Sequence, residues 1–313
     1  FKKYPGIKRL VIFSRDEQKQ YHMAQEYPSD RYPQIRFFIG DVRDEHRLIR
    51  AMHGVDYVIH AAALKQVPAA EYNPTECIRT NINGAENVIT AAIETNVEKV
   101  IALSTDKAAN PVNLYGATKL ASDKLFIAAN NISGGAKPRF SVVRYGNVVG
   151  SRGSVVPFFQ QLMAQGSDHI PVTHLEMTRF WISLQQGVDF VLKNFERMLG
   201  GEIFVPKIPS IRIVDLAKAM APHLPIKEVG IRPGEKLHEM MCPGDMSYHT
   251  YEFADHFVIA PAIKFFNRSN DFSSNALQEQ GKLVAPGFQY VSDANPDFLS
   301  VEQMRQFNQE AML

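Results

Sequence analysis

The sequence is poor in cysteine, in net charge and in long apolar runs, and each shortage excludes a class of protein. Only Cys77 and Cys242 are cysteines among 313 residues, too few for a disulfide framework, and we expect both to be core thiols in a reducing cytoplasm. A net charge of +1 gives no electrostatic basis for binding nucleic acid or an anionic membrane. No apolar run approaches the roughly 20 residues that span a bilayer, so we expect neither nucleic acid nor membrane as a partner.

A Gly-rich turn is also absent from the start of the chain. A dinucleotide-binding fold begins with a strand and such a turn, whose N–H groups hold the pyrophosphate at a helix N-terminus. The chain instead opens Phe1-Lys-Lys-Tyr-Pro-Gly6, which we interpret as the end of a first helix. We therefore expect roughly 25 residues of strand, turn and helix upstream of Phe1. A sheet without that strand would expose two unpaired edges, and we do not expect it to fold stably alone.

The sequence does contain a regular alternation of strand-like and helix-like segments. An apolar content of 45% and a charged content of 21% are those of an ordinary globular protein. The alternation predicts an α/β fold with a doubly wound parallel sheet of Rossmann type. The predicted strands are 7–14, 36–40, 55–61, 100–104 and 140–145, and the predicted helices are 17–26, 45–52, 73–96 and 111–130.

Two parts of this pattern carry more detail. The strand at 55–61 is apolar without interruption, which predicts burial on both faces. Beyond Gly150 the alternation loosens into shorter helices, at 155–164, 184–198 and 213–221, among short strands and prolines. We therefore expect residues 1–150 to form a Rossmann domain and residues 151–313 a smaller substrate-binding part with segments that return to the core.

Tyr115 and Lys119 stand four residues apart in Tyr115-Gly-Ala-Thr-Lys119, so a helix would place both side chains on one face. An ammonium group beside a phenol lowers a phenol pKa that starts near ~10. Tyr115 is thus a candidate base for a sugar or alcohol hydroxyl. The pattern occurs by chance on many helices, but here a predicted strand ends just before it, where open α/β sheets bind ligands.

Asp106 and Lys107 follow the same strand in Ser104-Thr105-Asp106-Lys107-Ala108. A simple hydride-transfer enzyme needs only the tyrosine, the lysine and a hydroxyl group. A further carboxylate and amine in the pocket indicate proton chemistry at a neighbouring carbon. We therefore expect a catalytic group without a metal ion, made of Asp106, Lys107, Tyr115 and Lys119.

Ser14-Arg15-Asp16 ends the strand where NAD-binding folds place an acidic residue on the adenine ribose. A serine removes the charge that would repel a 2′-phosphate, and the guanidinium of Arg15 offers a fork for one. Together with Lys19, one helical turn further on, these residues predict NADP as the cofactor. The alternative is that Arg15 and Lys19 are solvated surface charges.

Two more strand ends complete the predicted cofactor site. Asp41-Val42 follows the next strand, where the aspartate can accept a hydrogen bond from the adenine amino group. Ala61-Ala62-Ala63 ends the strand after that, with side chains small enough for close approach of the cofactor. Alanine runs are weak signals, so the prediction depends on their position.

Long blocks of the chain closely resemble the extended short-chain dehydrogenase/reductase superfamily. Within it they resemble the soluble UDP-N-acetylglucosamine 4,6-dehydratases that invert carbon 5, which begin pseudaminic acid synthesis. Tyr115 favours this subgroup, because the larger membrane-linked dehydratases and related epimerases carry methionine before their Gly-Ala-Thr-Lys. The blocks are Ser14-Arg-Asp-Glu17, Phe38-Ile-Gly-Asp-Val-Arg43, His60-Ala-Ala-Ala-Leu-Lys65, Ser104 to Pro111, Arg144 to Pro157, Met177-Thr-Arg-Phe180 and Arg232-Pro-Gly-Glu-Lys-Leu-His-Glu239.

The resemblance implies a UDP-sugar site and a homo-oligomer, since the family forms hexamers built from dimers. Arg232 suits a diphosphate and Glu235 the hydroxyls of a ribose. Without the resemblance, Arg232-Pro-Gly-Glu235 is an ordinary turn with a surface ion pair. The implied substrate contacts are Lys65, Thr105, Asn147, Val155, Thr173, Arg232 and Glu235, and Lys65, Tyr115, Lys119 and Asn147 are also implied to contact the cofactor.

The resemblance also implies a reaction on UDP-N-acetylglucosamine. Tyr115 would take the proton of the 4-hydroxyl, and the resulting 4-keto group would acidify the hydrogen on carbon 5. Lys107, neutralised by nearby positive charge and burial, would remove that hydrogen as a proton, and Asp106 would protonate the departing 6-hydroxyl. Reprotonation of carbon 5 from the opposite face would invert it.

Other functions remain open at this point. A UDP-sugar 4-epimerase on the same scaffold needs Tyr115 but gains nothing from Asp106 and Lys107. A retaining 4,6-dehydratase shares the chemistry but not the stereochemistry. A non-catalytic nucleotide-binding protein is consistent with the absent Gly-rich turn.

Overall fold

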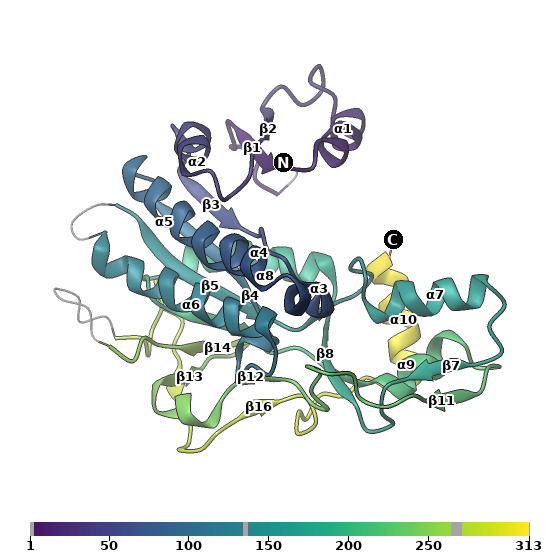
Figure 1. The fold of residues 1–313 in the computed structure, drawn as a ribbon. Coiled ribbons are helices and arrows are strands. Elements are labelled where there is room, and N and C mark those ends of the chain that lie inside the picture. Colours follow the sequence, from purple (N-terminus) through teal and green to yellow (C-terminus); the bar gives the residue numbers. More distant parts are fainter. Residues whose placement is uncertain (1–2, 134–136, 264–270, 313) are drawn as a thin grey trace.

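The computed structural model of the chain describes residues 3–133, 137–263 and 271–312. Its central feature is a seven-stranded sheet in the order β15-β13-β14-β9-β5-β4-β3 (Figure 1). Strands β3, β4, β5 and β9 are parallel, and each of the remaining pairs is antiparallel. The strands are β3 (Tyr57–His60), β4 (Lys99–Thr105), β5 (Arg139–Tyr145), β9 (Ile203–Pro206), β13 (Thr250–Glu252), β14 (His256–Ile259) and β15 (Lys282–Leu283).

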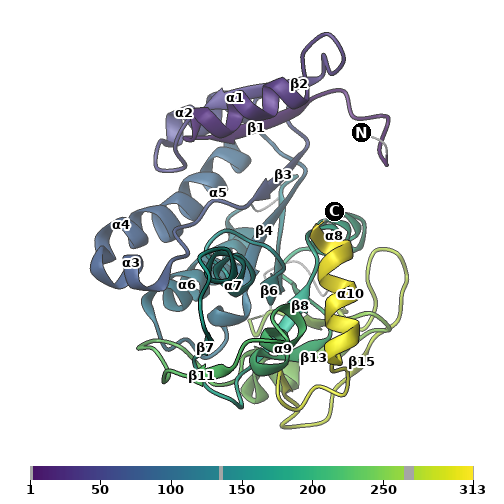
Figure 2. The same cartoon turned by 90° about the vertical axis from the view of Figure 1, so that its right-hand side faces the viewer.

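A separate parallel pair precedes this sheet in the chain. Figure 2 shows the pair, β1 (Leu10–Ser14) and β2 (Ile35–Ile39), with helix α1 (Glu17–Glu26) beyond the β3 edge of the large sheet. Among the described strands, β1 pairs only with β2 and β3 pairs only with β4. Residues 3–6, predicted as the end of a helix, form a turn because Pro5-Gly6 favours one, and residues 1 and 2 lie outside the described part.

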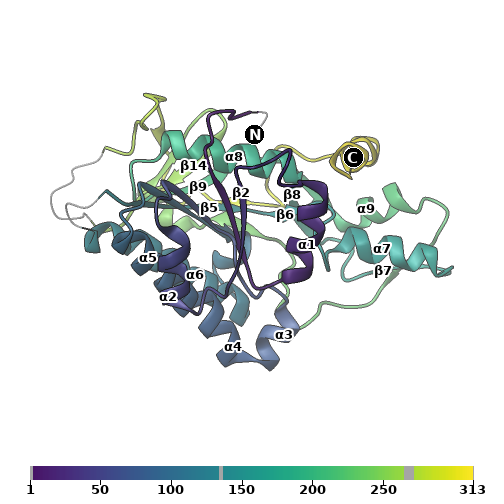
Figure 3. The same ribbon diagram turned by 90° about the horizontal axis from the view of Figure 1, so that it is seen from above.

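Helices cover both faces of the large sheet, as Figure 3 shows from above. On one face lie α2 (Glu45–Met52), α5 (Gly84–Glu94) and α6 (Leu114–Ile132), and on the other lies α8 (Leu184–Arg197). Successive strand residues point to opposite faces, so Val100 packs in the cluster with Phe126 of α6 while Ile101 packs in the cluster with Val191 of α8. The doubly wound α/β fold predicted from the alternation is confirmed.

Strand β3 departs from its prediction. It is shorter than 55–61, and although His60 is buried, the side chains of Tyr57 and Ile59 are 52% and 46% exposed. Burial on both faces is therefore wrong for this strand. The physical reason is that β3 forms an edge among the described strands, and Ile59 borders an apolar cavity of about 140 Å³ shared with Leu184 and Val188 of α8.

The long helix predicted at 73–96 contains a change of helix type. It begins as α4 (Pro74–Ile78), after the short helix α3 (Val67–Tyr72), and passes through a π-helical turn (Arg79–Asn83) into α5. In that turn the amide of Asn81 accepts from the backbone N of Leu64 at 2.8 Å and donates to its carbonyl at 3.0 Å. The π-helical turn therefore anchors the loop that follows β3.

The chain after residue 150 forms a second, smaller core around Trp181, Val156, Phe159 and Leu216, and also supplies β9, β13, β14 and β15 to the large sheet. No helix in the described part is both long and apolar enough to cross a bilayer. The remaining elements form this part, namely β6 (Asn147–Val148), β7 (Ile170–Val172), β8 (Thr178–Ile182), β10 (Ser210–Arg212), β11 (Ile226–Glu228), β12 (Met240–Cys242), β16 (Tyr290–Val291), α7 (Val155–Ala164), α9 (Ile213–Met220) and α10 (Val301–Met312).

Candidate active site

The carboxyl end of β4 turns directly into the predicted catalytic residues. Thr105 is the last residue of the strand, and Asp106–Ala108 form a single 3-10 turn. The hydroxyl of Thr105 accepts from the backbone N of Lys107 at 3.3 Å and donates to Oδ1 of Asp106 at 2.9 Å. Asp106 is fully buried, and its Oδ2 has no hydrogen-bond partner among the described residues. A buried carboxylate oxygen is thus left available at the end of the strand.

Helix α6 starts against this turn and carries Tyr115 and Lys119. Its N-cap is Asn113, whose side-chain oxygen accepts from the backbone N of Gly116 at 2.8 Å. A Cβ at position 116 would collide with the carbonyl oxygen of Lys107, so only glycine lets the helix approach this closely. Tyr115 is half-buried and Lys119 is buried. The close approach brings the phenol of Tyr115 to the Thr105–Lys107 turn.

The pKa of Tyr115 differs from the prediction. Burial raises the pKa of Tyr115 to about 12, while the charge of Lys107 and a hydrogen bond with Thr105 act to lower it. The largest charge effect that lowers the pKa of the phenol comes from Lys107, whereas the four-residue spacing predicted Lys119. Burial lowers the pKa of Lys119 itself, and its charge combines with burial to hold the pKa of His60 at about 3. The charge of Lys119 thus acts on a neutral histidine at the end of β3.

Lys107 also differs from its predicted state. Its Nζ lies 3.0 Å from Oδ1 of Asp106 and 3.1 Å from Oε1 of Glu239. Burial alone would lower the pKa of Lys107, but the charges of these two carboxylates outweigh burial and raise it. The prediction that positive neighbours neutralise this lysine is therefore wrong. Lys107 is an ammonium held between two carboxylates.

The Arg232–Glu239 segment is tied to the catalytic turn. Asn113 donates from Nδ2 to the carbonyl of Gly234 at 2.7 Å, and Lys236 donates from Nζ to the carbonyl of Ala109 at 2.6 Å. Arg232 and Glu235 face each other across the turn at 4.0 Å, and the Arg232 side chain is 61% exposed. The turn with an ion pair is present, and its hydrogen bonds attach this segment to Ala109, just after the catalytic turn, and to Asn113, at the start of α6.

The other predicted substrate contacts lie on separate segments of the chain. Lys65 lies near Lys107, since burial and the charge of Lys107 both lower its pKa. Asn147 in β6 has a buried Oδ1 without a partner among the described residues, and Val155 is the first residue of α7. Thr173 follows β7, and no contact of the described residues links it with the catalytic turn.

The predicted cofactor residues at the ends of β1 and β2 gather into one charged group. Arg15 lies 3.6 Å from Asp41, and Asp41 also accepts from Arg43 at 2.8 Å. Partial burial acts to raise the pKa of Asp41, but the hydrogen bonds and charges of the two arginines lower it overall. Across the end of β1, Asp16 caps α1 by accepting from Lys19 N at 2.9 Å and pairs with Lys19 Nζ at 3.1 Å.

The remaining predicted cofactor residues lie at or just after the ends of β1, β2 and β3. The hydroxyl of Ser14 accepts from the backbone N of Asp16 at 3.1 Å, which shapes the turn after β1. Val42 is buried and packs so closely on α5 that a Cβ on Gly84 would lie 2.7 Å from it. Ala61 and Ala62 are exposed and Ala63 is half-buried after β3, so this backbone is open to a ligand.

Four charged residues near these sites were missed as site residues. Glu239 contacts Lys107, and both Arg179 (3.9 Å) and Lys236 (4.0 Å) lie near its carboxylate. Arg43 pairs with Asp41. Each of these four residues lies inside a sequence block that carries the family resemblance, and that block was the only signal for it in the sequence. No local pattern indicated which charged residue each would pair with.

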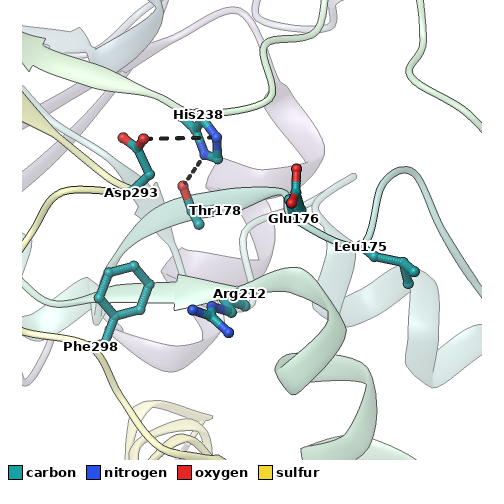
Figure 4. Close-up of a pocket in the computed structure, with 7 residues that line it drawn as sticks. All are labelled: Leu175, Glu176, Thr178, Arg212, His238, Asp293 and Phe298. Carbon is teal, nitrogen blue, oxygen red and sulfur yellow. Dashed lines mark hydrogen bonds and ion pairs between the residues drawn. The ribbon is translucent and has the colours of Figure 1, made fainter.

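A separate cavity of about 330 Å³ does not include the predicted catalytic residues (Figure 4). Its polar wall is a hydrogen-bonded chain in which Nδ1 of His238 meets Oγ1 of Thr178 at 2.8 Å and Nε2 lies 3.9 Å from Asp293. His238 and Thr178 immediately precede Glu239 and Arg179 in the sequence. The cavity is lined by Leu175, Glu176, Thr178, Arg212, His238, Asp293 and Phe298.

Comparison with known proteins identifies the family of the chain. A family model described as polysaccharide biosynthesis protein matches residues 2–261. The chain belongs to this family. A relative from Campylobacter jejuni, named UDP-N-acetylglucosamine 4,6-dehydratase (inverting), is 62% identical over 296 residues, which cover 95% of this chain and 88% of that protein. The resemblance to the inverting dehydratases is thereby confirmed.

Two further comparisons place the family member among related proteins. A Rickettsia conorii protein named UDP-glucose 4-epimerase is 45% identical over 304 residues, covering 96% of this chain and 86% of that protein. The X-ray structure of Pen from Bacillus thuringiensis superposes with a TM-score of 0.85 at 36% identity, covering 97% of this chain and 90% of that chain. The fold is therefore shared across most of the chain with a solved structure.

Proposed function

We propose that the chain dehydrates UDP-N-acetylglucosamine across carbons 5 and 6, with inversion at carbon 5 and NADP as cofactor. The product is UDP-2-acetamido-2,6-dideoxy-β-L-arabino-hex-4-ulose, the first intermediate of pseudaminic acid synthesis. The observation that carries this proposal is the Asp106–Lys107 pair, at 3.0 Å, packed against the start of the helix that bears Tyr115. The 62% identity with the Campylobacter jejuni protein of that name supports the same substrate and stereochemistry.

The residues present fit a dinucleotide cofactor. Asn147 offers a buried amide oxygen without a partner among the described residues, and the exposed backbone at Ala61 and Ala62 leaves room for close approach. The half-exposed guanidinium of Arg15 sits beside Asp41, where a 2′-phosphate could compete for it, which supports NADP over NAD. The chemistry that NADP would supply when bound is uptake of a hydride from carbon 4 and its return to carbon 6.

The residues of the catalytic turn divide the proton transfers between them. Tyr115, as its phenolate, takes the proton of the 4-hydroxyl, and the charge of Lys107 acts against the burial that raises the pKa of the phenol. Because Lys107 is an ammonium, it becomes a base for the carbon-5 proton only after giving a proton to Asp106 across their 3.0 Å contact. The same transfer makes Asp106 the acid that the departing 6-hydroxyl requires. Water leaves, and the ion pair is restored.

Two further attributes complete the proposal. We include a homo-oligomer built from dimers, because the family forms hexamers of that kind. We also include a cytoplasmic location, which is consistent with Cys77 and Cys242 being free and buried.

A single assay separates this function from the 4-epimerase that the Rickettsia relative's name favours. The purified full-length protein is incubated with UDP-N-acetylglucosamine and NADP, and the mass of the product is measured by mass spectrometry. We expect a product lighter than the substrate by one water. A product of unchanged mass would support the epimerase, and absence of any product would support a non-catalytic nucleotide-binding protein.

A further inference from the structure

Glu239 is a buried carboxylate that the proposed proton transfers leave without a role. Its Oε1 lies 3.1 Å from Nζ of Lys107, and Oδ1 of Asp106 lies 3.0 Å from the same atom. The side chain of Glu239 is only 2% exposed, and that of Asp106 is fully buried. Glu239 directly precedes β12, so the two carboxylates come from distant segments that meet at one ammonium group.

The backbone of Glu239 is fixed by a chain of polar side chains. Its N–H donates to Oγ of Ser292 at 2.9 Å, and Ser292 shares a 2.7 Å hydrogen bond with Oγ1 of Thr178. Thr178 is bonded in turn to His238, as Figure 4 shows. These bonds connect β8, the segment just before β12 and the loop after β16. A carboxylate on so constrained a backbone can hold a flexible lysine in one place.

Asp106 alone cannot hold Lys107 throughout the reaction. In the proposed transfers Asp106 becomes neutral when it accepts the proton of Lys107, and ionised again when the hydroxyl departs. Glu239 is the carboxylate neighbour whose charge the reaction does not require to change. The charged and titratable groups that surround Lys107 are Asp106, Glu239, Arg179, Lys236, Lys65 and Tyr115.

We propose that Glu239 is the positioning residue of Lys107, holding its amino group at carbon 5 and stabilising the positive charge gained with the carbon-5 proton. This inference rests on the function proposed above. A buried carboxylate acts in the same way beside a catalytic imidazole, which it orients and stabilises without taking the proton itself. In this step the C–H bond breaks, its electron pair remains on the carbon beside the 4-keto group, and its proton bonds to Nζ of Lys107. Glu239 stays ionised throughout.

The test replaces Glu239 with glutamine, which keeps the shape and removes the charge. We expect Glu239→Gln to lower kcat by about 100-fold or more while KM changes by no more than about twofold, since only the proton transfer is weakened. In a single turnover, reduced nicotinamide should accumulate, because oxidation at carbon 4 proceeds while loss of the carbon-5 proton stalls. Glu202→Gln is the matched control, because Glu202 is equally buried but hydrogen-bonds Ser141 and backbone N–H groups instead of a cation.

A second readout does not depend on turnover. Brief reductive methylation followed by peptide mass spectrometry measures how much of each lysine is an uncharged amine. Losing one of two carboxylate neighbours should lower the pKa of Lys107 by at least about one unit, so its labelling relative to exposed Lys227 should rise at least about tenfold in Glu239→Gln. Glu202→Gln should leave this ratio at the wild-type value.

The outcomes distinguish a failure of the role proposed for Glu239 from a failure of the proposed function. A wild-type protein that forms no dehydrated product contradicts the proposed function, whatever Lys107 does. An active wild-type protein whose Glu239→Gln variant keeps both its kcat and its Lys107 labelling overturns the role of Glu239. If Glu239→Gln fails to fold, Glu239→Asp retains the charge on a shorter side chain. It should then show a reduced kcat with labelling near the wild-type value, and an unchanged kcat would overturn the positioning role.

Discussion

Replacing Gly116 with alanine should nearly abolish dehydration while leaving most of the fold intact. Helix α6 begins so close to the catalytic turn that the added Cβ would collide with the carbonyl oxygen of Lys107 and lie 3.1 Å from Cβ of Pro111. Neither obstacle is the end of a flexible side chain that could swing away. The turn that carries Asp106 and Lys107 must therefore move relative to Tyr115.

The size of that movement sets the expected loss. To restore an ordinary contact of 3.4 Å, the carbonyl of Lys107 must retreat by about 1 Å. A displacement of that size between reacting groups costs about 100-fold in rate, so kcat/KM for water loss should fall by about that factor. Overpacking costs about 1–3 kcal/mol, and the better helix propensity of alanine offsets about 1 kcal/mol of this, so the free energy of unfolding should fall by no more than about 2 kcal/mol.

The assay pairs product formation, followed by mass spectrometry, with urea unfolding of the same samples. Gly187→Ala is the matched control, because Gly187 is also a buried helical glycine but a Cβ there has no atom within 4 Å. It should keep full activity and gain up to about 1 kcal/mol. Wild-type kcat/KM in Gly116→Ala would refute the argument that this close approach positions the catalytic turn.

Four further predictions address the cofactor, the proton transfer, the fold and its pH dependence. Arg15→Ala should weaken NADP binding by about 1.5–3 kcal/mol, measured by titration calorimetry, but affect NAD little; equal losses would mean that Arg15 supports only the fold. Lys107→Ala should abolish release of the 4-keto product and leave NADP binding nearly intact, and a comparable loss of binding would contradict its role at carbon 5. Replacing Arg197 with methionine should lower the free energy of unfolding by about 2 kcal/mol, because Arg197 is 1% exposed and pairs with Asp255 and Glu279. This loss is smaller than the roughly 3–5 kcal/mol expected for a fully buried pair, because both acids are partly exposed. A loss near zero would contradict this prediction. Hydrogen bonding to Arg197 lowers the pKa of Glu279 to about 2 from its ordinary value of 4.5. The stability that ionised Glu279 contributes is therefore complete above pH 4.5 and is lost as the pH falls toward 2. In Glu279→Gln the free energy of unfolding, measured by urea unfolding, should depend less on pH between these values.

Periodicity alone located most of the elements that carry the site. The helices predicted at 45–52 and 155–164 coincide with α2 and α7, because their apolar spacing reflects the one face each packs on the core. The π-helical turn before α5 could not be predicted in this way. It coincides with the contact between Asn81 and the loop after β3, which depends on tertiary structure and leaves no local pattern.

The positions of the predicted catalytic residues were easier to predict than their electrostatics. Asp106, Lys107 and Tyr115 lie within one strand–helix connection, as the sequence order requires, and their catalytic roles stay predictions. The charge state of Lys107 was predicted wrongly because Glu239, the second carboxylate beside it, comes from a segment far along the chain. Sequence separation of this kind conceals an ion pair until the fold is known.

The stereochemistry at carbon 5 tests the central claim most directly. The full-length protein should be incubated with UDP-N-acetylglucosamine in deuterated water, and the earliest product examined by NMR, since an acidic hydrogen beside a ketone also exchanges without enzyme. If Lys107 removes the carbon-5 proton and a donor on the other face returns one from solvent, the first product carries deuterium at carbon 5 in the L-arabino configuration. A first product with the retained D-xylo configuration would contradict the inverting assignment.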